Sequence, residues 1–304
     1  MTTIKNQNFG IEIELTGITR EKAADIIANH FGTRSFHIGT SYDTYGATDS
    51  KGRTWKCMSD SSIRVERKDG RYCGAREYQC EVVSPILQYE DIDTLQAIVR
   101  ELRAAGALAN DSCGIHVHVD GANHDANSLR HLMMLFINRQ DLIYKALEIG
   151  NRANRWCKPM SNDLFKAMKA DSEHTKASTE RIWYSRANDG YMGGIDHQHY
   201  NSTRYHGVNL HAFFTKGTVE FRLFNGTTHA GKIKAYIQFC LAMSAWATQA
   251  KDTFWFTKVT DEKQAMEDLL ERRLKLKGKE FETCRTHLTK AFQIENNGRT
   301  EGVA

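Results

Sequence analysis

The sequence has few of the features that mark linkers, membrane spans or disulfide frameworks. Only two prolines occur in 304 residues, and no low-complexity tract interrupts the chain, which argues against long linkers. No apolar run approaches the ~20 residues that a membrane-spanning helix needs, and the opening MTTIKNQNFG lacks the apolar core of a signal peptide. The seven cysteines include no CxxC pair, so we expect reduced thiols in a cytoplasmic protein without a membrane segment.

Charge of one sign and nucleotide-binding loops are also sparse. The net charge of +4 suits an anionic ligand, but it is too small to indicate nucleic-acid binding. The chain has no GxxxxGK followed by Ser or Thr, and no GxGxxG between a strand and a helix. These absences exclude a P-loop and a Rossmann dinucleotide site. A nucleotide site in this chain would therefore have to be built on a sheet.

Five short segments alternate polar and apolar residues with the period of two that is typical of β-strands. They are GIEIEL, EYQCEVV, GIHVHVD, GVNLHAF and GTVEFRLF. Their polar faces carry Glu12 and Glu14; Glu77, Gln79 and Glu81; His116, His118 and Asp120; Asn209 and His211; and Glu220 and Arg222. Solvated strand faces are usual in antiparallel sheets, but these faces almost lack Lys and Thr. If the strands pair, their polar faces form one continuous polar surface of the sheet, which we call the floor.

The rest of the chain is read as helices, turns and one long insertion. Apolar periodicity predicts helices over 21–31, 92–105, 128–149, 232–248 and 261–278. Strands over 55–67 and 72–83 are predicted on either side of a turn at KDGR. Residues 151–206 show no clear period and are predicted to form an irregular lid or substrate insertion. We expect an α+β catalytic domain over 1–250 and a helical extension over 251–304.

The residue types of the floor indicate phosphoryl transfer. Several carboxylates close together repel one another unless cations neutralise them. Carboxylate oxygens beside a few imidazoles suit Mg²⁺ or Mn²⁺ better than zinc. Arg222, on the same strand as Glu220, could clamp a phosphate through two hydrogen bonds. In such sites, positioning and charge neutralisation supply most of the catalysis.

An ordered series of motifs resembles a known family. The series runs GIEIEL, SDSSI, EVVSPIL, CGIHVHVD, NRANRWC, RYHGVNLH and GTVEFRLFNGT, over residues 9–227. It resembles the amidoligase family, within the glutamine synthetase and glutamate–cysteine ligase superfamily of carboxylate–amine ligases. The resemblance implies a glutamine synthetase-like catalytic fold, with a curved antiparallel sheet and helices packed on its outer face. It also implies an ATP-dependent ligase that joins a small-molecule or peptide carboxylate to an amine through an acyl phosphate.

The resemblance also implies roles for individual residues. The expected ligands of two or three Mg²⁺ ions are Glu12, Glu14, Glu81, Glu220 and His116. The nucleotide-binding residues would be His116, His118, Arg152 and Arg222, with Arg222 against the transferring phosphoryl group. Arg152 and Arg155 of NRANR are similar to arginines that grip a carboxylate or phosphate. Asp60 of SDSSI is similar to an aspartate that binds and deprotonates the amine, although Ser61 replaces the usual glycine.

Two other interpretations stay open at this point. The first is a zinc- or iron-dependent hydrolase or cupin-like oxygenase that uses His116, His118 and one glutamate. Against it, a cupin needs a glutamate a few residues after the HxH, and that interval here is VDGANHD. The second is a catalytically silent binding module on the same fold. Histidines at 197, 199 and 206 suggest zinc as well, but a polar lid is the preferred interpretation because no cysteines accompany them.

Overall fold

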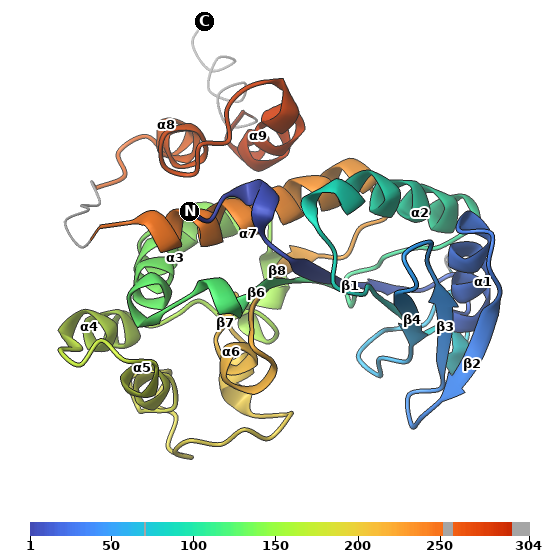
Figure 1. Cartoon of the computed structure of the whole chain (residues 1–304), viewed down its shortest axis with the longest axis horizontal. Helices are drawn as coiled ribbons and strands as arrows, with labels where there is room; N and C mark the ends of the chain where they lie inside the picture. Colours follow the sequence, from blue (N-terminus) through green and yellow to red (C-terminus); the bar gives the residue numbers. More distant parts are fainter. Residues whose placement is uncertain (70, 252–257, 294–304) are drawn as a thin grey trace, which may run out of the picture. The chain divides into compact units, whose positions relative to one another are not determined.

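The computed structural model describes residues 1–69, 71–251 and 258–293. The strands in these residues are β1 (Phe9–Leu15), β2 (Ser35–Gly39), β3 (Thr44–Thr48), β4 (Thr54–Met58), β5 (Cys80–Val83), β6 (Gly114–Asp120), β7 (Val208–Asn209) and β8 (Thr218–Asn225). The helices are α1 (Arg20–His30), α2 (Ile92–Ala104), α3 (Ala126–Ala146), α4 (Asn162–Ala170), α5 (Lys176–Trp183), α6 (His211–Lys216), α7 (Ala230–Gln249), α8 (Glu262–Asp268) and α9 (Glu282–Thr289) (Figure 1).

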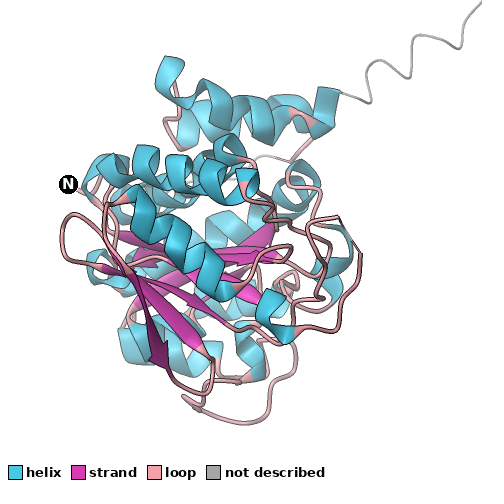
Figure 2. Ribbon diagram, turned by 90° about the vertical axis from the view of Figure 1, so that its right-hand side faces the viewer, coloured by secondary structure: helices cyan, strands magenta, loops and turns pink. Residues whose placement is uncertain are grey.

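The strands form one sheet in the order β2-β3-β4-β5-β1-β6-β8-β7. The pairs β2–β3, β3–β4, β4–β5, β1–β5 and β7–β8 are antiparallel. Figure 2 shows the strands together with the helices that surround them. The expected α+β class is confirmed, since helices and an antiparallel sheet occur in one chain. None of the helices in the described residues is both long and apolar enough to cross a membrane.

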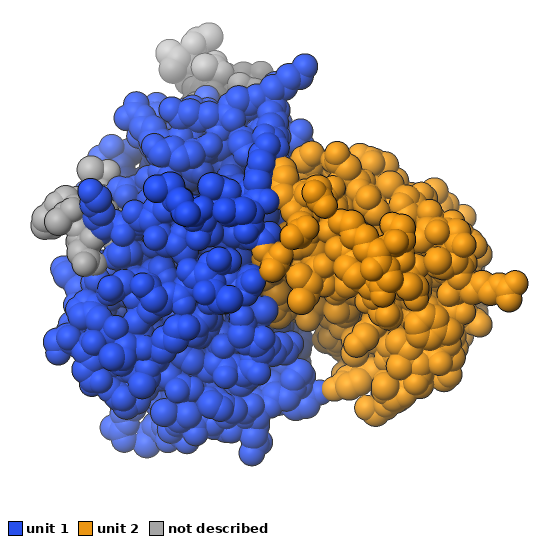
Figure 3. Space-filling view, viewed as in Figure 1, with its two compact units in different colours: residues 1–7, 119–223, 235–304 blue, residues 8–118, 224–234 orange. Residues whose placement is uncertain are grey.

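The chain forms two compact units, each of which contains several chain segments (Figure 3). Unit 1 contains residues 1–7, 119–223 and 235–304, and unit 2 contains residues 8–118 and 224–234. In unit 1, helix α3 packs against α4, α5, α8 and α9. The domain limits expected from the sequence, 1–250 and 251–304, stay predictions. Of the expected helical extension, residues 252–257 and 294–304 lie outside the described residues.

Period-two alternation separates the two faces of the sheet in unit 2. In β1, Ile11, Ile13 and Leu15 are buried on the apolar face, while Glu12 and Glu14 share the other. Helix α1 packs on strands β2 to β5, and Phe31, which directly follows the helix, contacts the Trp55 ring, with centroids 6.3 Å apart. Trp55 lies on the same face as the buried Cys57. The helices of this unit therefore cover the apolar face and leave the carboxylates on the opposite one.

Two of the predicted strands are shorter than expected. The segment 207–213 forms only the two-residue strand β7, after which helix α6 begins at His211. Asn209 Oδ1 accepts a hydrogen bond from the His211 backbone N–H at 2.8 Å, a local bond that favours a turn. Asn209 and His211 therefore do not share a strand face, and that prediction is wrong. In EYQCEVV, a 3-10 turn over Arg76–Tyr78 replaces the first half of the strand, so only Glu81 lies on β5.

The secondary structure predicted elsewhere also needs correction. Residues 151–206 are not irregular throughout, because they include α4 and α5, whose N-caps Ser161 and Thr175 accept bonds from backbone N–H groups. β4 ends at Met58, and the predicted hairpin at KDGR is reduced to a single bridge between Glu66 and Tyr72; Gly70 lies outside the described residues. The predicted helix over 261–278 is helix α8 followed by a π-helical turn over Leu269–Arg273.

Candidate active site

Carboxylates and imidazoles from three neighbouring strands lie on the face of the unit 2 sheet that is opposite helix α1. Glu12 and Glu14 come from β1, Glu81 comes from β5, and His116 and His118 come from β6. Strand β1 lies between β5 and β6 in the sheet. The structure therefore brings together five of the residues that the sequence singles out, and we call them the carboxylate–histidine cluster.

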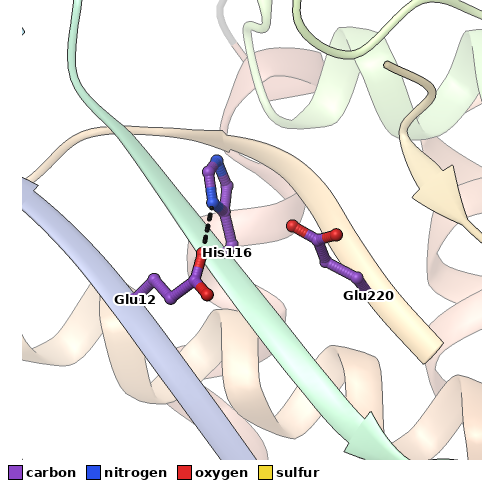
Figure 4. Close-up of side chains that lie close together, drawn as sticks. All are labelled: Glu12, His116 and Glu220. Carbon is purple, nitrogen blue, oxygen red and sulfur yellow. Dashed lines mark hydrogen bonds and ion pairs between the residues drawn. The ribbon is translucent and has the colours of Figure 1, made fainter. Parts of the chain in front are cut away.

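Glu12 bridges the two histidines of the HVHV strand. Its Oε2 lies 2.9 Å from His116 Nδ1 (Figure 4), and its Oε1 lies 3.2 Å from His118 Nε2. Burial alone would raise the pKa of the Glu12 carboxyl. The charge of His118 and hydrogen bonds from both imidazoles lower this pKa by more than burial raises it. The net effect holds this pKa well below its ordinary value. Glu12 is therefore ionised at neutral pH and orients both imidazole rings.

Glu14 and Glu81 lie directly opposite each other on β1 and β5. Both residues are buried, with 4% of Glu14 and 9% of Glu81 exposed. Glu14 Oε2 accepts a hydrogen bond from the Gly114 backbone N–H at 2.6 Å, and its Oε1 lies 3.8 Å from His116 Nε2. Among the described residues, no lysine or arginine of either unit forms an ion pair with Glu14. Two facing carboxylates in this setting repel each other unless a cation lies between them.

These residues fit a hard divalent cation. One ligand atom each from Glu14, Glu81 and His116 lies within 4.8 Å of the other two. Two ligands of one Mg²⁺ ion are at most about 4.2 Å apart, since each Mg–ligand distance is about 2.1 Å. Side-chain shifts of roughly half an ångström would therefore bring the three ligand atoms within coordination distance of one ion. Two carboxylates and one imidazole favour Mg²⁺ or Mn²⁺ over softer metals.

Asp60 lies in the loop that follows β4, in the same unit. It comes two residues after Met58, which is directly opposite Glu81. Its Oδ1 accepts a hydrogen bond from the Ser62 backbone N–H at 2.7 Å. Ser61 is not among the residues of the described chain with positive φ. The turn therefore does not require the glycine that is usual at this position, and serine is compatible with the backbone.

In unit 1, Glu220 is held by two side chains. It lies on β8 (Figure 4) opposite Asn209 of β7, with 2% of the residue exposed. Arg222 Nη1 donates to Glu220 Oε1 at 2.6 Å, and Asn209 Nδ2 donates to Oε2 at 2.6 Å. The Arg222 Nε also donates to the Trp156 carbonyl at 3.5 Å. The buried guanidinium is thereby fixed in orientation, as binding of a phosphate or carboxylate requires.

Arginines and aromatic rings alternate around Arg222. The Arg155 guanidinium stacks on the Trp156 ring at 4.3 Å, and both Arg204 and Arg222 lie over Tyr205, at 5.7 and 5.9 Å. The sequence analysis missed Trp156 and Tyr205, although each directly follows an arginine in the chain. Each ring holds a guanidinium flat and leaves the edge of that guanidinium to bind an anion.

Arg152, which was expected to bind a phosphate or carboxylate, is buried in the same unit. Its Nε has no hydrogen-bond partner within the described part of the chain. Burial raises the pKa of the Cys157 thiol, and the nearby charges of Arg152 and Arg222 oppose that rise. The two arginines therefore lie close to one thiol, and an anionic ligand would satisfy the buried Arg152 donor.

The histidines of the 151–206 segment have partners of their own. His197 Nε2 lies 2.7 Å from Glu180 Oε1, and the buried His206 ring packs on Trp183, with centroids 5.8 Å apart. His211, on helix α6, hydrogen-bonds the Tyr184 hydroxyl through Nδ1 at 2.6 Å. These contacts attach the segment to its own helices and to α6.

The comparisons with known proteins agree with the motif series. The model of the family described as "Putative amidoligase enzyme" matches residues 5–244, which is most of the chain. The chain belongs to this amidoligase family. Membership supports an enzyme with a ligase-type activity. A search of curated proteins found no match.

Proposed function

We propose that the protein is an ATP-dependent carboxylate–amine ligase with a glutamine synthetase-like catalytic fold. The observation that carries the proposal is the buried pair Glu14 and Glu81, which face each other and share His116. Burying two facing carboxylates is costly unless a cation is bound between them. An amidoligase needs such a cation to hold the phosphates of ATP.

The reaction transfers a phosphoryl group and then forms an amide. A carboxylate oxygen of the first substrate attacks the γ-phosphorus of ATP, the bond to the bridging oxygen breaks, and ADP leaves. The amine nitrogen attacks the carbon of the resulting acyl phosphate. The carbon–oxygen bond to phosphate then breaks, and the nitrogen loses a proton. The products are an amide, ADP and phosphate, so atoms and charges balance.

The residues of the chain have separate roles in this scheme. Glu14, Glu81 and His116 would hold Mg²⁺, with Glu12 and Glu220 as the further carboxylates of the metal set. A divalent ion bound there would neutralise the triphosphate charge. His118 would orient Glu12, to which it is bonded, or contact the nucleotide.

Charged residues outside the metal set have proposed roles in binding the phosphoryl group and the two substrates. Arg222, fixed by Glu220 and the Trp156 carbonyl, would stabilise the transferring phosphoryl group. Arg152 and Arg155 would bind a phosphate or the substrate carboxylate. Asp60 would bind the amine and accept its proton.

The composition of the metal set weakens the hydrolase and oxygenase alternative. That alternative requires both imidazoles and one glutamate around a single zinc or iron ion. The described set within 4.8 Å in unit 2 contains Glu14, Glu81 and only one of the two histidines, His116. Glu12 hydrogen-bonds His116 and lies within ion-pair distance of His118. A hard-metal site is therefore the better fit.

Trapping with hydroxylamine tests the reaction type. Hydroxylamine converts an acyl phosphate into a hydroxamate, which forms a coloured iron complex. We expect hydroxamate from at least one member of a panel of amino acids, dicarboxylates and short peptides, only when both ATP and Mg²⁺ are present. Wild-type protein that binds Mg²⁺ and ATP but releases ADP without hydroxamate or amide would contradict the proposal. Such a protein would be an ATPase.

A further inference from the structure

The sheet face of unit 2 that carries the carboxylate–histidine cluster extends well beyond the cluster. The register of the antiparallel pairs aligns five residues in one row across the sheet: Glu12, Val83, Lys56, Gly46 and Phe36. Because paired strands are about 4.8 Å apart, Lys56 lies roughly 10 Å from Glu12 and Phe36 roughly 19 Å from it. All five residues belong to the same compact unit.

The outer end of this row is apolar and accessible. Phe36 and Ile38 lie on the edge strand β2 with 44% and 39% of each residue exposed. A Cβ added at Gly46 would lie 2.7 Å from the Phe36 ring and 3.0 Å from Ile38 Cδ1. The Phe36 ring therefore lies across the Gly46 backbone, in space that a side chain at 46 would occupy. Exposed apolar side chains on the sheet face that also carries a polar cluster can form part of a ligand-binding surface.

Lys56 is the cation between this apolar end and the cluster. Its side chain is exposed, and no carboxylate in residues 1–69, 71–251 or 258–293 forms an ion pair with it. Asp60 follows four residues later, at most about 14 Å away at Cα. A ligand on this surface thus meets a positive group and an apolar patch, with Asp60 in the loop that continues β4.

We propose that Phe36, Ile38 and Lys56 bind the amine substrate and select one that also carries a carboxylate and a bulky apolar group. The inference rests on the proposed ligase function, which supplies the need for an amine. The amine of the ligand lies toward Asp60, its carboxylate binds Lys56, and its apolar group packs on Phe36 and Ile38. An α-amino acid with an aromatic or branched side chain has this chemistry. A triphosphate fits less well, because it offers no apolar group to Phe36 and Ile38 and Asp60 would repel it.

The test measures binding of four probes to the whole chain in the presence of Mg²⁺ and a non-hydrolysable ATP analogue. L-Phenylalanine and L-leucine carry all three groups, glycine lacks the apolar group, and L-phenylalaninamide lacks the carboxylate. We expect the first two to bind at least about tenfold more tightly than the last two. Phe36→Ser and Lys56→Met should each weaken binding of L-phenylalanine by about tenfold or more.

Control variants separate a local effect from misfolding. Ile86→Ser removes an exposed apolar side chain elsewhere in unit 2, and Lys22→Met removes an exposed lysine of α1. Neither should change affinity for L-phenylalanine. Gly46→Ala is a second probe of the patch, because φ at Gly46 is not positive and the backbone tolerates alanine. The added methyl group must displace the Phe36 ring, so affinity for L-phenylalanine should change while the thermal midpoint stays near that of the wild type.

Three outcomes would overturn the inference, and a fourth separates it from the ligase function. If the ATP analogue binds and none of the probes does, the surface does not bind this substrate class. If Lys56→Met weakens the analogue as much as L-phenylalanine, the surface holds the nucleotide. If Phe36→Ser changes only the oligomeric state, measured by light scattering, β2 is an interface between copies. If the probes bind but the analogue does not, the ligase function fails while this binding surface stands.

Discussion

Glu14 and Glu81 face each other across the β1–β5 pair, both buried, with His116 within reach of both. In a solvated sheet face, facing glutamates can turn away from each other into water. Here burial prevents that, and the Gly114 backbone N–H holds Glu14 in place. Under the proposed function, a cation held by this pair would neutralise both charges.

Replacing Glu81 by glutamine should stabilise the metal-free protein and abolish its response to Mg²⁺. Glu81→Gln removes one of two repelling charges, so we expect unfolding to become harder by about 1 kcal/mol in EDTA. Mg²⁺ should raise the thermal midpoint of the wild type and leave that of the variant unchanged. Calorimetric melting with EDTA and with Mg²⁺ measures both effects. Glu21→Gln, at an exposed position of α1, is the matched control and should respond to Mg²⁺ as the wild type does.

Arg222→Lys should greatly reduce catalytic activity while leaving the fold intact. Arg222 binds Glu220 and the Trp156 carbonyl at the same time, and an ammonium group cannot reproduce this planar arrangement. We expect ADP release to fall about 100-fold or more, with an unchanged far-ultraviolet circular dichroism spectrum. Arg272→Lys, which changes an exposed arginine, should keep full activity. Normal turnover in the Arg222 variant would assign this residue a structural role only.

Asn209→Asp should create a pH-dependent instability. The new carboxylate would face the buried Glu220 in place of the amide that now donates to it, so its pKa in the native state is raised. We expect a loss of about 2–3 kcal/mol at neutral pH. The loss should shrink as pH falls through the raised native pKa and vanish below the unfolded value, about 4. Urea unfolding of variant and wild type across this range measures the difference, and a pH-independent loss would contradict the explanation.

The buried His124 should make the stability of the wild-type protein sensitive to acid. Burial lowers the pKa of this imidazole to about 4, and hydroxyls of Ser128 and Ser244 bond its two nitrogens. Between pH 6.5 and about 4, the unfolded chain binds a proton that the native protein excludes. Stability is therefore full above pH 6.5 and falls by about 3 kcal/mol on acidification through this window.

The matched variant for this prediction is His124→Gln, which is neutral throughout. Its stability at pH 7 will be lower, since two buried hydroxyls lose a ring partner, but the extra fall between pH 6.5 and 4 should disappear. Denaturant midpoints at several pH values, compared between the two proteins, isolate the contribution of His124. Equal slopes in both would show that other groups cause the acid sensitivity.

Strands with strict alternation were predictable from the sequence. FGIEIEL and GIHVHVD place apolar and polar residues on opposite faces with the strand period, and both appear as β1 and β6. The cluster follows from these strands once β5 is placed beside β1. That placement is a long-range pairing, which period-two patterns cannot specify; the family resemblance implied only that these carboxylates share one metal set.

Other elements depend on interactions that a local pattern does not reveal. GVNLHAF alternates as well as β1 does, yet the bond from the His211 N–H to the Asn209 side chain begins a helix there. Strands β2 and β3 went unrecognised because Gly46 and several threonines interrupt any apolar pattern. In the structure they pair antiparallel, with the Phe36 ring lying across the Gly46 backbone. The stacking of Trp156 with Arg155 was likewise visible only in three dimensions.

The most direct test of the account is a calorimetric titration of the purified protein with ATP, run with Mg²⁺ and again with EDTA, on wild type and on Glu14→Gln. The glutamine keeps an oxygen that can accept the Gly114 N–H bond, so the fold should persist. The account predicts that ATP binds the wild type only with Mg²⁺ and that the variant does not bind under either condition. Equal ATP binding with Mg²⁺ and with EDTA, in both the wild type and the variant, would contradict the assignment of Glu14 and Glu81 as the metal site.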